Sequence, residues 1–284
     1  MKHHSSKRHW TLFATATRYA LTEHLRNRFA MVLVAVFIPV WTAFAFLSVP
    51  STKVPFQLRA TGEPLTPGGN QLTEITGALN AVTLIIGFMM FAAAFSSGHF
   101  DRRLAMAGYP RTHLILAKIT SLTPASGVVA LYATAFTCMF RVPDQPILFT
   151  AALFCAGLTY GALGVAFGSL LRREVEGMFA IVMISVMDLA LQNPLYSSGS
   201  DSPIVRYLPA YGAMQASTGA AFSSTPLTQY LAIQLLWFAA AALVGLLSFH
   251  RRTRTTLPAF RQPQLIPHQQ PETVQQPEST EPLA

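Results

Sequence analysis

The chain has 284 residues, of which 51% are hydrophobic and only 11% are charged, and its mean hydropathy is +0.39. This charge density is less than half that of an ordinary soluble domain, which excludes a soluble enzyme and favours a membrane protein. The net charge of +8 would suit a nucleic-acid partner in a soluble chain. Here the charges lie in short stretches between long apolar runs, so we expect no nucleic-acid partner.

Residues 1–28 form a basic leader that we expect to lie as an amphipathic helix in the cytoplasmic membrane interface. The apolar residues at helical spacing are Trp10, Phe13, Ala14, Leu21 and Leu25. The opposite side carries Arg18, Glu23 and Arg26. Several threonines weaken this helix, so a solvated leader attracted to anionic lipid stays open as the alternative.

Residues 29–250 form the expected transmembrane domain, because about 20 apolar residues cross the hydrocarbon core. The six expected spans are 29–47, 75–95, 114–140, 147–171, 177–192 and 230–249. The first span is too long and too far from the start for a cleaved signal peptide, so we expect no maturation. These features predict an all-α membrane protein with six transmembrane helices.

The lysines and arginines alternate with the spans. In the predicted topology sixteen of them lie on one side of the membrane, and only Lys53, Arg59, Arg141 and Arg206 lie on the other. Cytoplasmic loops carry the excess of positive charge, so both termini are expected in the cytoplasm. This pattern predicts a multi-pass protein of the bacterial cytoplasmic membrane.

Three segments outside the spans have distinct characters. A short helix over residues 100–111 is expected between spans two and three, ended by a glycine and a proline. Residues 193–228 alternate apolar residues with proline and glycine breaks, which is typical of a re-entrant segment or of a packed outer lid. Residues 251–284 are rich in proline and glutamine and are expected to be a disordered tail.

Sequence motifs for covalent chemistry are missing. No glycine–lysine dipeptide exists for a phosphate-binding loop, and neither a zinc-protease nor a serine-nucleophile motif occurs. The two cysteines, Cys138 and Cys155, lie inside apolar runs and can build neither a disulfide framework nor a zinc module. We therefore expect no cofactor, no metal and no catalytic residue in this chain, whose function would be movement, sensing or scaffolding.

Two features inside the spans invite a functional interpretation. Small-residue spacing in span four favours close helix packing, either within the chain or between subunits; the residues are Gly157, Gly161, Gly164 and Gly168. In span five, Ser185, Asp188 and Gln192 share one helical face. An aspartate at this depth faces protein or water, so Asp188 either lines a substrate route or makes structural hydrogen bonds, with Arg206 as a possible partner.

Taken together, this architecture resembles the membrane subunit of a type-two ABC exporter. The local resemblance lies in Phe100–Arg103 followed by Tyr109–Leu114 and Lys118, and in residues 164–174 at the exit of span four. The chain departs from the family pattern at two places. It has Asp101 where the family has glutamate, and it has Leu-Ala-Met-Ala at residues 104–107 where the family has a glycine-threonine-leucine-glutamate run. The resemblance covers residues 7–254, in architecture more than in signature residues.

The resemblance implies a mechanism and its partners. Two permease copies, as a homodimer or a heterodimer, would surround a central path in the lipid membrane, and two copies of a separate ATPase subunit would bind ATP and magnesium. The ATPase would contact the leader and the coupling helix through Asp101, Arg102, Arg103, Tyr109 and Arg111. Spans two and five would line the path with Phe88, Met89, Phe91, Phe95, Met183, Met187 and Asp188.

Adaptable methionine and phenylalanine surfaces suit a drug-like, antibiotic or lipid-like amphiphile as cargo. Two other functions stay open from the residues alone. One is an ion-coupled secondary transporter that uses Asp188 and needs no ATPase. The other is a membrane anchor or sensor that acts through the basic cytoplasmic face.

Overall fold

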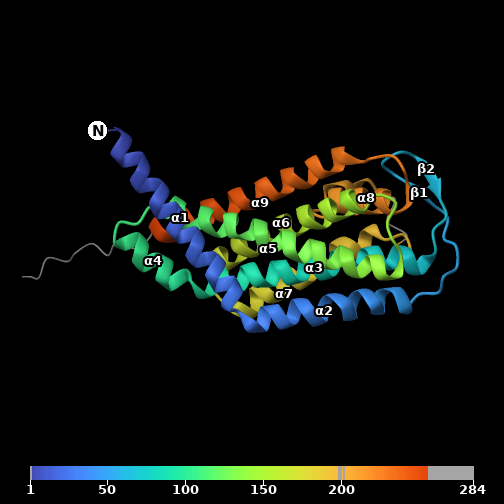
Figure 1. The fold of residues 1–284 in the computed structure, drawn as a ribbon, viewed down its shortest axis with the longest axis horizontal. Helices are drawn as coiled ribbons and strands as arrows, with labels where there is room; N and C mark the ends of the chain where they lie inside the picture. The colour runs from blue at the N-terminus through green and yellow to red at the C-terminus, as the bar shows by residue number, and fades with distance from the viewer. Residues whose placement is uncertain (1, 198–199, 201, 255–284) are drawn as a thin grey trace, which may run out of the picture.

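The computed structural model describes residues 2–197, 200 and 202–254, and this part of the chain forms a bundle of helices (Figure 1). Five helices in it are long and apolar enough to cross a membrane. They are α2 (Arg28–Leu47), α3 (Gly69–Ser96), α5 (Arg111–Phe140), α6 (Pro146–Leu170) and α9 (Thr228–Arg254). The chain is therefore an all-α, membrane-embedded protein, and most of the expected tail, from residue 255, lies outside the described residues.

The fifth expected span corresponds to α7 (Glu174–Gln192), which is not among those five helices. It is 19 residues long and carries Glu174, Glu176 and Asp188. It packs mainly on α3 and runs along the bundle beside that helix (Figure 1). Its status as a sixth crossing is taken up below as part of the proposed function.

The centre of the bundle is the pair α3 and α6. In each, 72% of the most apolar window is buried, against 22% in α2 and 17% in α9. The two central helices approach closely because α6 presents glycine where α3 presents backbone. A β-carbon built on Gly164 would lie 2.4 Å from the carbonyl oxygen of Gly87, and one on Gly168 would lie 3.0 Å from that of Phe91. Glycine at these positions thus sets the spacing of the core.

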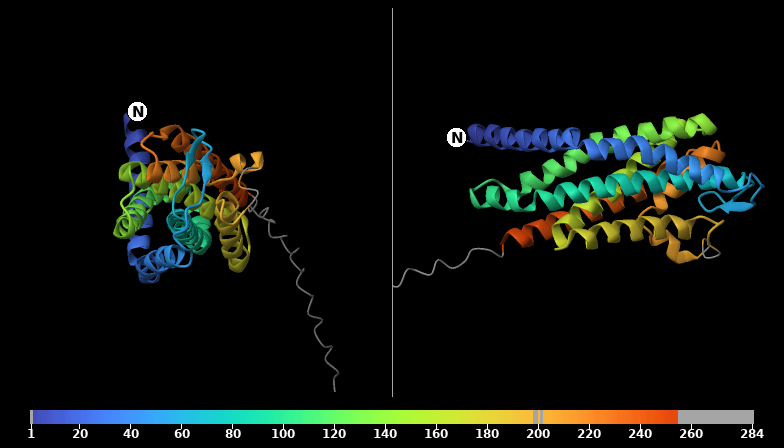
Figure 2. Two further views of the ribbon diagram at one scale, coloured as in Figure 1. Left: turned by 90° about the vertical axis from the view of Figure 1, so that its right-hand side faces the viewer. Right: turned by 90° about the horizontal axis from the view of Figure 1, so that it is seen from below.

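The elements that do not cross gather at the two ends of the bundle (Figure 1). One end holds α1 (Lys2–Arg26) and α4 (Gly98–Met106). The opposite end holds β1 (Phe56–Leu58), β2 (Glu63–Leu65), the 3-10 helix η2 (Pro203–Tyr207) and α8 (Tyr211–Phe222). The right-hand view in Figure 2, seen from below, shows the same separation.

The antiparallel hairpin of β1 and β2 was not expected from the sequence. It pairs Phe56 with Leu65 and packs Leu58 and Leu65 on Leu227, at the start of α9. Gly62 supports the turn with a φ of +72°, a conformation that glycine adopts without steric cost. Strands of three residues carry too short a pattern to be recognised in a sequence.

The positively charged residues are distributed unevenly between the two ends of the bundle. Arg102 and Arg103 lie on α4, Arg172 and Arg173 lie in the α6–α7 turn, and Arg251 lies near the end of α9, all at the α1 end. The hairpin end holds Lys53, Arg59, Arg141 and Arg206. The folded chain thus has one strongly basic end.

Candidate functional site

The helix expected over residues 100–111 is shorter than predicted. α4 covers Gly98–Met106, and the chain then turns at Gly108, whose φ of +89° belongs to the left-handed region. Of the expected coupling residues, Asp101, Arg102 and Arg103 lie on α4. Tyr109 lies in the turn, and Arg111 is the first residue of α5.

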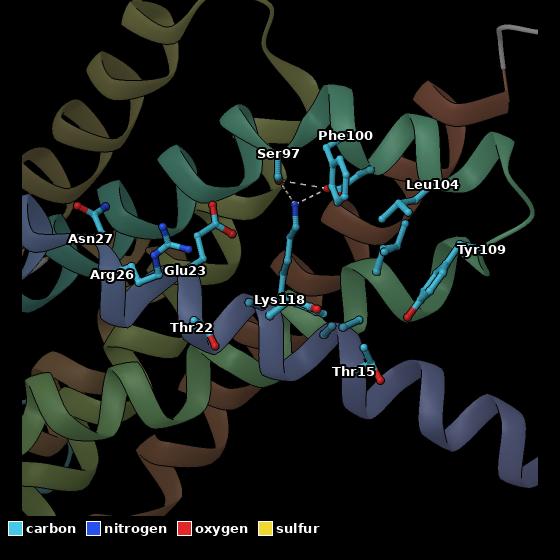
Figure 3. Close-up of a pocket in the computed structure, with 16 residues that line it drawn as sticks. Thr15, Thr22, Glu23, Arg26, Asn27, Ser97, Phe100, Leu104, Tyr109 and Lys118 are labelled. Atoms are coloured by element: carbon cyan, nitrogen blue, oxygen red, sulfur yellow. Dashed lines mark hydrogen bonds and ion pairs between the residues drawn. The ribbon is translucent and has the colours of Figure 1, made fainter.

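Asp101 does not face outward, as a contact to a partner would require. It is 5% exposed and forms an ion pair with Lys118 of α5, and Lys118 also donates to Ser97 (Figure 3). The Ser97 hydroxyl donates to the Asp101 carboxylate at 3.1 Å. Asp101 therefore holds α4 onto α5 within the chain.

The outward surface of α4 combines positive charge with apolar side chains. Arg102 and Arg103 are exposed, as are Phe100 and Met106, at 63% and 64%. Hot spots of protein interfaces favour this combination of arginine with large apolar groups. We call Phe100, Arg102, Arg103 and Met106 the α4 surface.

The helix α1 lies against α5 and the turn that follows α4. The Tyr109 hydroxyl donates to the Leu12 carbonyl at 2.5 Å, and the His24 Nε2 atom lies 3.2 Å from the Ser121 hydroxyl. Burial raises the pKa of Tyr109. Burial, and then the nearby charge of Lys118, lowers the pKa of His24 below its ordinary value. The polar contacts thus fix α1 near its middle, at Leu12, and near its C-terminal end, at His24.

The face that α1 turns to the bundle differs from the expected apolar stripe. Phe13 and Leu21 are half-buried as expected, but Trp10 and Leu25 are 70% and 73% exposed. The contact face instead includes the small residues Ala16 and Ala20. These small residues leave space between α1, α4 and α5, where a cavity of about 880 Å³ opens (Figure 3).

The expected path residues differ in burial. Phe91 is fully buried and stacks on Phe95 with ring centroids 5.5 Å apart. Its ring occupies the space that a side chain at residue 177 would need, and that residue is glycine. Met187 is 57% exposed on the other side of α7 from buried Asp188. The remaining three, Phe88, Met89 and Met183, are half-buried.

A groove of about 130 Å³ lies instead between α2 and α7, with α3 as its floor. Its walls are apolar and include Trp41, Phe44 and Val186, and its floor includes Thr76 and Asn80. Asn80 donates to the Ser185 hydroxyl at 3.0 Å, but its Oδ1 atom has no partner in the described part of the chain. Asn80 was not among the expected site residues, although an amide in the middle of an apolar span marks a site.

Asp188 makes structural hydrogen bonds. Its carboxylate accepts from the Tyr160 hydroxyl at 2.5 Å, from Gln192 Nε2 at 2.6 Å and from the Ala210 backbone N–H at 2.7 Å. The partner considered from the sequence, Arg206, has an exposed side chain instead. Asp188 thus joins α6 and α7 to the N-terminus of α8.

A second buried polar residue fixes α8 from the other side. Gln234 of α9 accepts from the Ala213 backbone N–H at 2.9 Å and donates to the Pro209 carbonyl at 2.9 Å. It also donates to the Thr159 hydroxyl at 2.7 Å. Thr159 and Tyr160 are adjacent on α6 and contact Gln234 and Asp188, respectively. The two residues that bind α8 are therefore both anchored to α6 at the same level of the bundle. We call Asp188, Gln234, Thr159 and Tyr160 the α8 clamp.

The four glycines of α6 all face helices of the same chain. A β-carbon on Gly157 would lie 3.1 Å from Ser126 of α5, and one on Gly161 would lie 2.3 Å from Leu122. Gly164 and Gly168 face α3, as described above. The structure places this stripe inside the chain, where it leaves no surface for a second subunit.

The basic end of the bundle therefore combines an exposed α4 surface with a leader helix, while the opposite end holds a clamped, buried helix. No protein-family model matches this chain, and no curated protein sequence is significantly similar to it.

Proposed function

We propose that this chain is the transmembrane permease subunit of an ATP-driven exporter of the type-two ABC kind. The observation that carries the proposal is that α1 meets the turn after α4 at the basic end. Tyr109, next to α4, bonds directly to the backbone of α1. A force applied to the exposed α4 surface would therefore reach α1 and, through the Asp101–Lys118 pair, α5.

In this proposal α7 is a sixth transmembrane helix. Its 19 residues span about 28 Å at 1.5 Å per residue, close to the hydrocarbon thickness of about 30 Å. Six crossings place both termini on one side. Since cytoplasmic segments carry the excess of positive charge, the basic end supports a cytoplasmic location for both termini, in a bacterial cytoplasmic membrane.

The ATP chemistry belongs to a partner in this proposal. Two copies of a separate ATPase subunit would bind ATP and magnesium and contact the α4 surface of each permease. The permease would pair with a second copy of itself or with a related chain. Arg102 and Arg103 are the residues best placed for the ATPase contact, whereas Asp101 positions the helix that carries them.

The cargo in this proposal is a drug-like, antibiotic or lipid-like amphiphile. The groove between α2 and α7 supports this class, because its walls are mostly apolar and its floor carries the polar residues Thr76 and Asn80. Pockets for such ligands are mostly apolar, with a few placed polar groups. Trp41, Phe44 and Asn80 thus replace Phe91 and Asp188 as the proposed cargo contacts.

The ion-coupled alternative would require Asp188 to exchange an ion or a proton with a water-filled route. Asp188 is 2% exposed and its carboxylate accepts from three donors of the chain. These contacts favour the structural role. No specific observation favours a membrane anchor or sensor.

The test is recovery of an ATPase with the permease. We would purify the protein from its native membrane in mild detergent and quantify co-purifying chains for the wild type and for the Arg102→Ala/Arg103→Ala double variant. The matched control is Arg172→Ala/Arg173→Ala, two adjacent exposed arginines at the same end of the bundle.

The proposal expects a soluble ATPase in stoichiometric amount with the wild type and the control, and at least about tenfold less with the α4 variant, as for lost interface hot spots. A permease recovered alone from several mild detergents would overturn it.

A further inference from the structure

The cavity of about 880 Å³ beneath α1 is separate from the cargo groove and shares only Phe100 with the α4 surface. Figure 3 shows it between α1 on one side and α4 with α5 on the other. Its volume lies in the range of about 300 to 1,000 Å³ that small-molecule pockets occupy. It is therefore large enough for part of an amphiphilic molecule.

Most of the cavity wall is apolar. Ala16 and Ala20 of α1 face Leu104 of α4 and Leu114 and Ala117 of α5. The Tyr109–Leu12 and His24–Ser121 contacts fix α1 on either side of its alanines. The space between those two contacts is thus a built feature of the way α1 docks.

The cavity lies where the membrane interface is expected. Leu114 and Ala117 belong to the first two turns of α5, and Arg26 and Asn27 lie at the junction of α1 with α2. A leader helix at this level rests among lipid headgroups and upper acyl chains. The molecules most abundant at this opening are phospholipids of the same leaflet.

The charged residues that line the cavity favour one kind of lipid headgroup. Lys118 is paired with Asp101 and so supplies no net charge. The remaining charged residues of the lining are Glu23 and Arg26, three positions apart on α1, and no ion pair joins them in the described part of the chain. A zwitterionic headgroup complements this pattern, since its phosphate can face Arg26 and its ammonium can face Glu23.

We propose that this cavity binds one phospholipid whose zwitterionic headgroup carries a primary ammonium, with an acyl chain along Ala16, Ala20, Leu104 and Leu114. A primary ammonium donates hydrogen bonds to the Glu23 carboxylate, whereas a quaternary ammonium cannot. An anionic headgroup lacks the positive group that Glu23 requires. The site needs neither the ATPase nor the cargo, so its test is independent of the proposed function.

The test is lipid retention by the purified full chain, measured by native mass spectrometry. The probes are dioleoyl phosphatidylethanolamine, phosphatidylcholine and phosphatidylglycerol at equal concentration. The wild type is expected to retain the ethanolamine lipid at least about tenfold better than the other two, as for the loss of one charge-assisted hydrogen bond. Glu23→Gln is expected to abolish this preference for the ethanolamine headgroup.

A variant that fills the cavity provides a second test of the proposal. Ala20→Trp places an indole in the lining and is expected to abolish retention, while the control Ala14→Trp, on the exposed side of α1, is expected to leave it unchanged. Thermal unfolding of both variants without added lipid checks that they fold. Retention of the ethanolamine lipid by Ala20→Trp, or equal retention of all three lipids by the wild type, would overturn the proposal.

A photo-crosslinking residue at Ala20 in native membranes identifies the occupant directly. A phospholipid adduct supports the proposal. An adduct to a protein chain would assign the cavity to a protein partner and overturn it.

Discussion

The two ends of the bundle hold their non-spanning helices in different ways. At the hairpin end, α8 is buried along its length, and the α8 clamp binds its first backbone groups from α7 and from α9. At the basic end, α1 is joined to the α4 turn through Leu12 and Tyr109 and to α5 through His24 and Ser121, and it borders a cavity of about 880 Å³. Elements with few buried contacts open at low free energy, so motion is expected at the basic end.

This difference assigns separate roles to the ends in the proposed exporter. The clamped end moves with α6, α7 and α9 as one unit. The loosely held α1 can shift against the bundle when a partner binds the α4 surface, which the Asp101–Lys118 pair couples to α5. The predictions below test the contrast from its strongest element to its weakest.

Asp188→Ala is expected to have the largest effect on stability. It leaves the Tyr160 hydroxyl, the Gln192 amide and the Ala210 N–H without their acceptor, at a cost of about 3 to 5 kcal/mol in the free energy of unfolding. Thermal unfolding in detergent measures the loss. Asp188→Asn retains one acceptor oxygen and is expected to lose less, and a wild-type transition for Asp188→Ala would refute the clamp.

Gly164→Ala is expected to separate the two central helices. Its β-carbon would lie 2.4 Å from the Gly87 carbonyl oxygen and 3.0 Å from the Phe91 nitrogen, and backbone atoms cannot rotate away. Overpacking of this kind costs about 2 to 3 kcal/mol. Gly127→Ala in α5 is the control, since nothing lies within 4 Å of the added carbon there, and it should unfold no earlier than the wild type. Equal stability of the two variants would contradict the assigned packing.

The long elements of this fold could be predicted from the sequence, because a run of about 20 apolar residues between charges has few alternatives to a membrane helix. The ends of five of the six expected spans agree with helices to within a few residues, and the start of α3 extends six residues further, to Gly69. The hairpin and the length of α4 could not be predicted. Three-residue strands have too little pattern, and the end of α4 depends on the turn at Gly108.

The site was harder to predict, because it depends on contacts between residues far apart in the sequence. Asp188 was recognised as an unusual residue, yet its partner Tyr160 lies 28 positions away and looked like any aromatic residue of an apolar span. Asp101 sits in a helix of mixed polarity, where sequence does not tell an outward carboxylate from one paired with Lys118. Asn80 and Gln234 carried a readable signal, since amides within apolar spans require partners.

Lys118→Met is expected to loosen α4 without unfolding the bundle. The substitution leaves the buried Asp101 carboxylate with the Ser97 hydroxyl but without its cation, which should lower the local opening free energy of α4 by about 1.5 to 2 kcal/mol. Hydrogen–deuterium exchange resolved over Gly98–Met106 measures this change. Arg102→Ala, an exposed change on the same helix, is the control, and equal exchange in both variants would contradict the positioning role of the pair.

The smallest expected effect is a pH dependence of α1 docking. Burial lowers the pKa of His24 in the docked state relative to the value of about 6.5 for an exposed imidazole. The undocked state then binds more protons, so docking is fully favoured above about pH 6.5 and weakens as the pH falls below it. Burial also raises the pKa of Glu23, and protonation of this carboxyl group favours docking as the pH falls. The two residues therefore oppose each other, which keeps the net change small.

His24→Gln separates the two contributions. Its amide can still reach the Ser121 hydroxyl, but it does not titrate, so lowering the pH from 7.5 to 5.5 is expected to weaken α1 docking less in the variant than in the wild type. Hydrogen exchange over residues 12–24, corrected for the intrinsic effect of pH, measures both slopes. Identical slopes in the variant and the wild type would show that His24 is solvated in the docked helix.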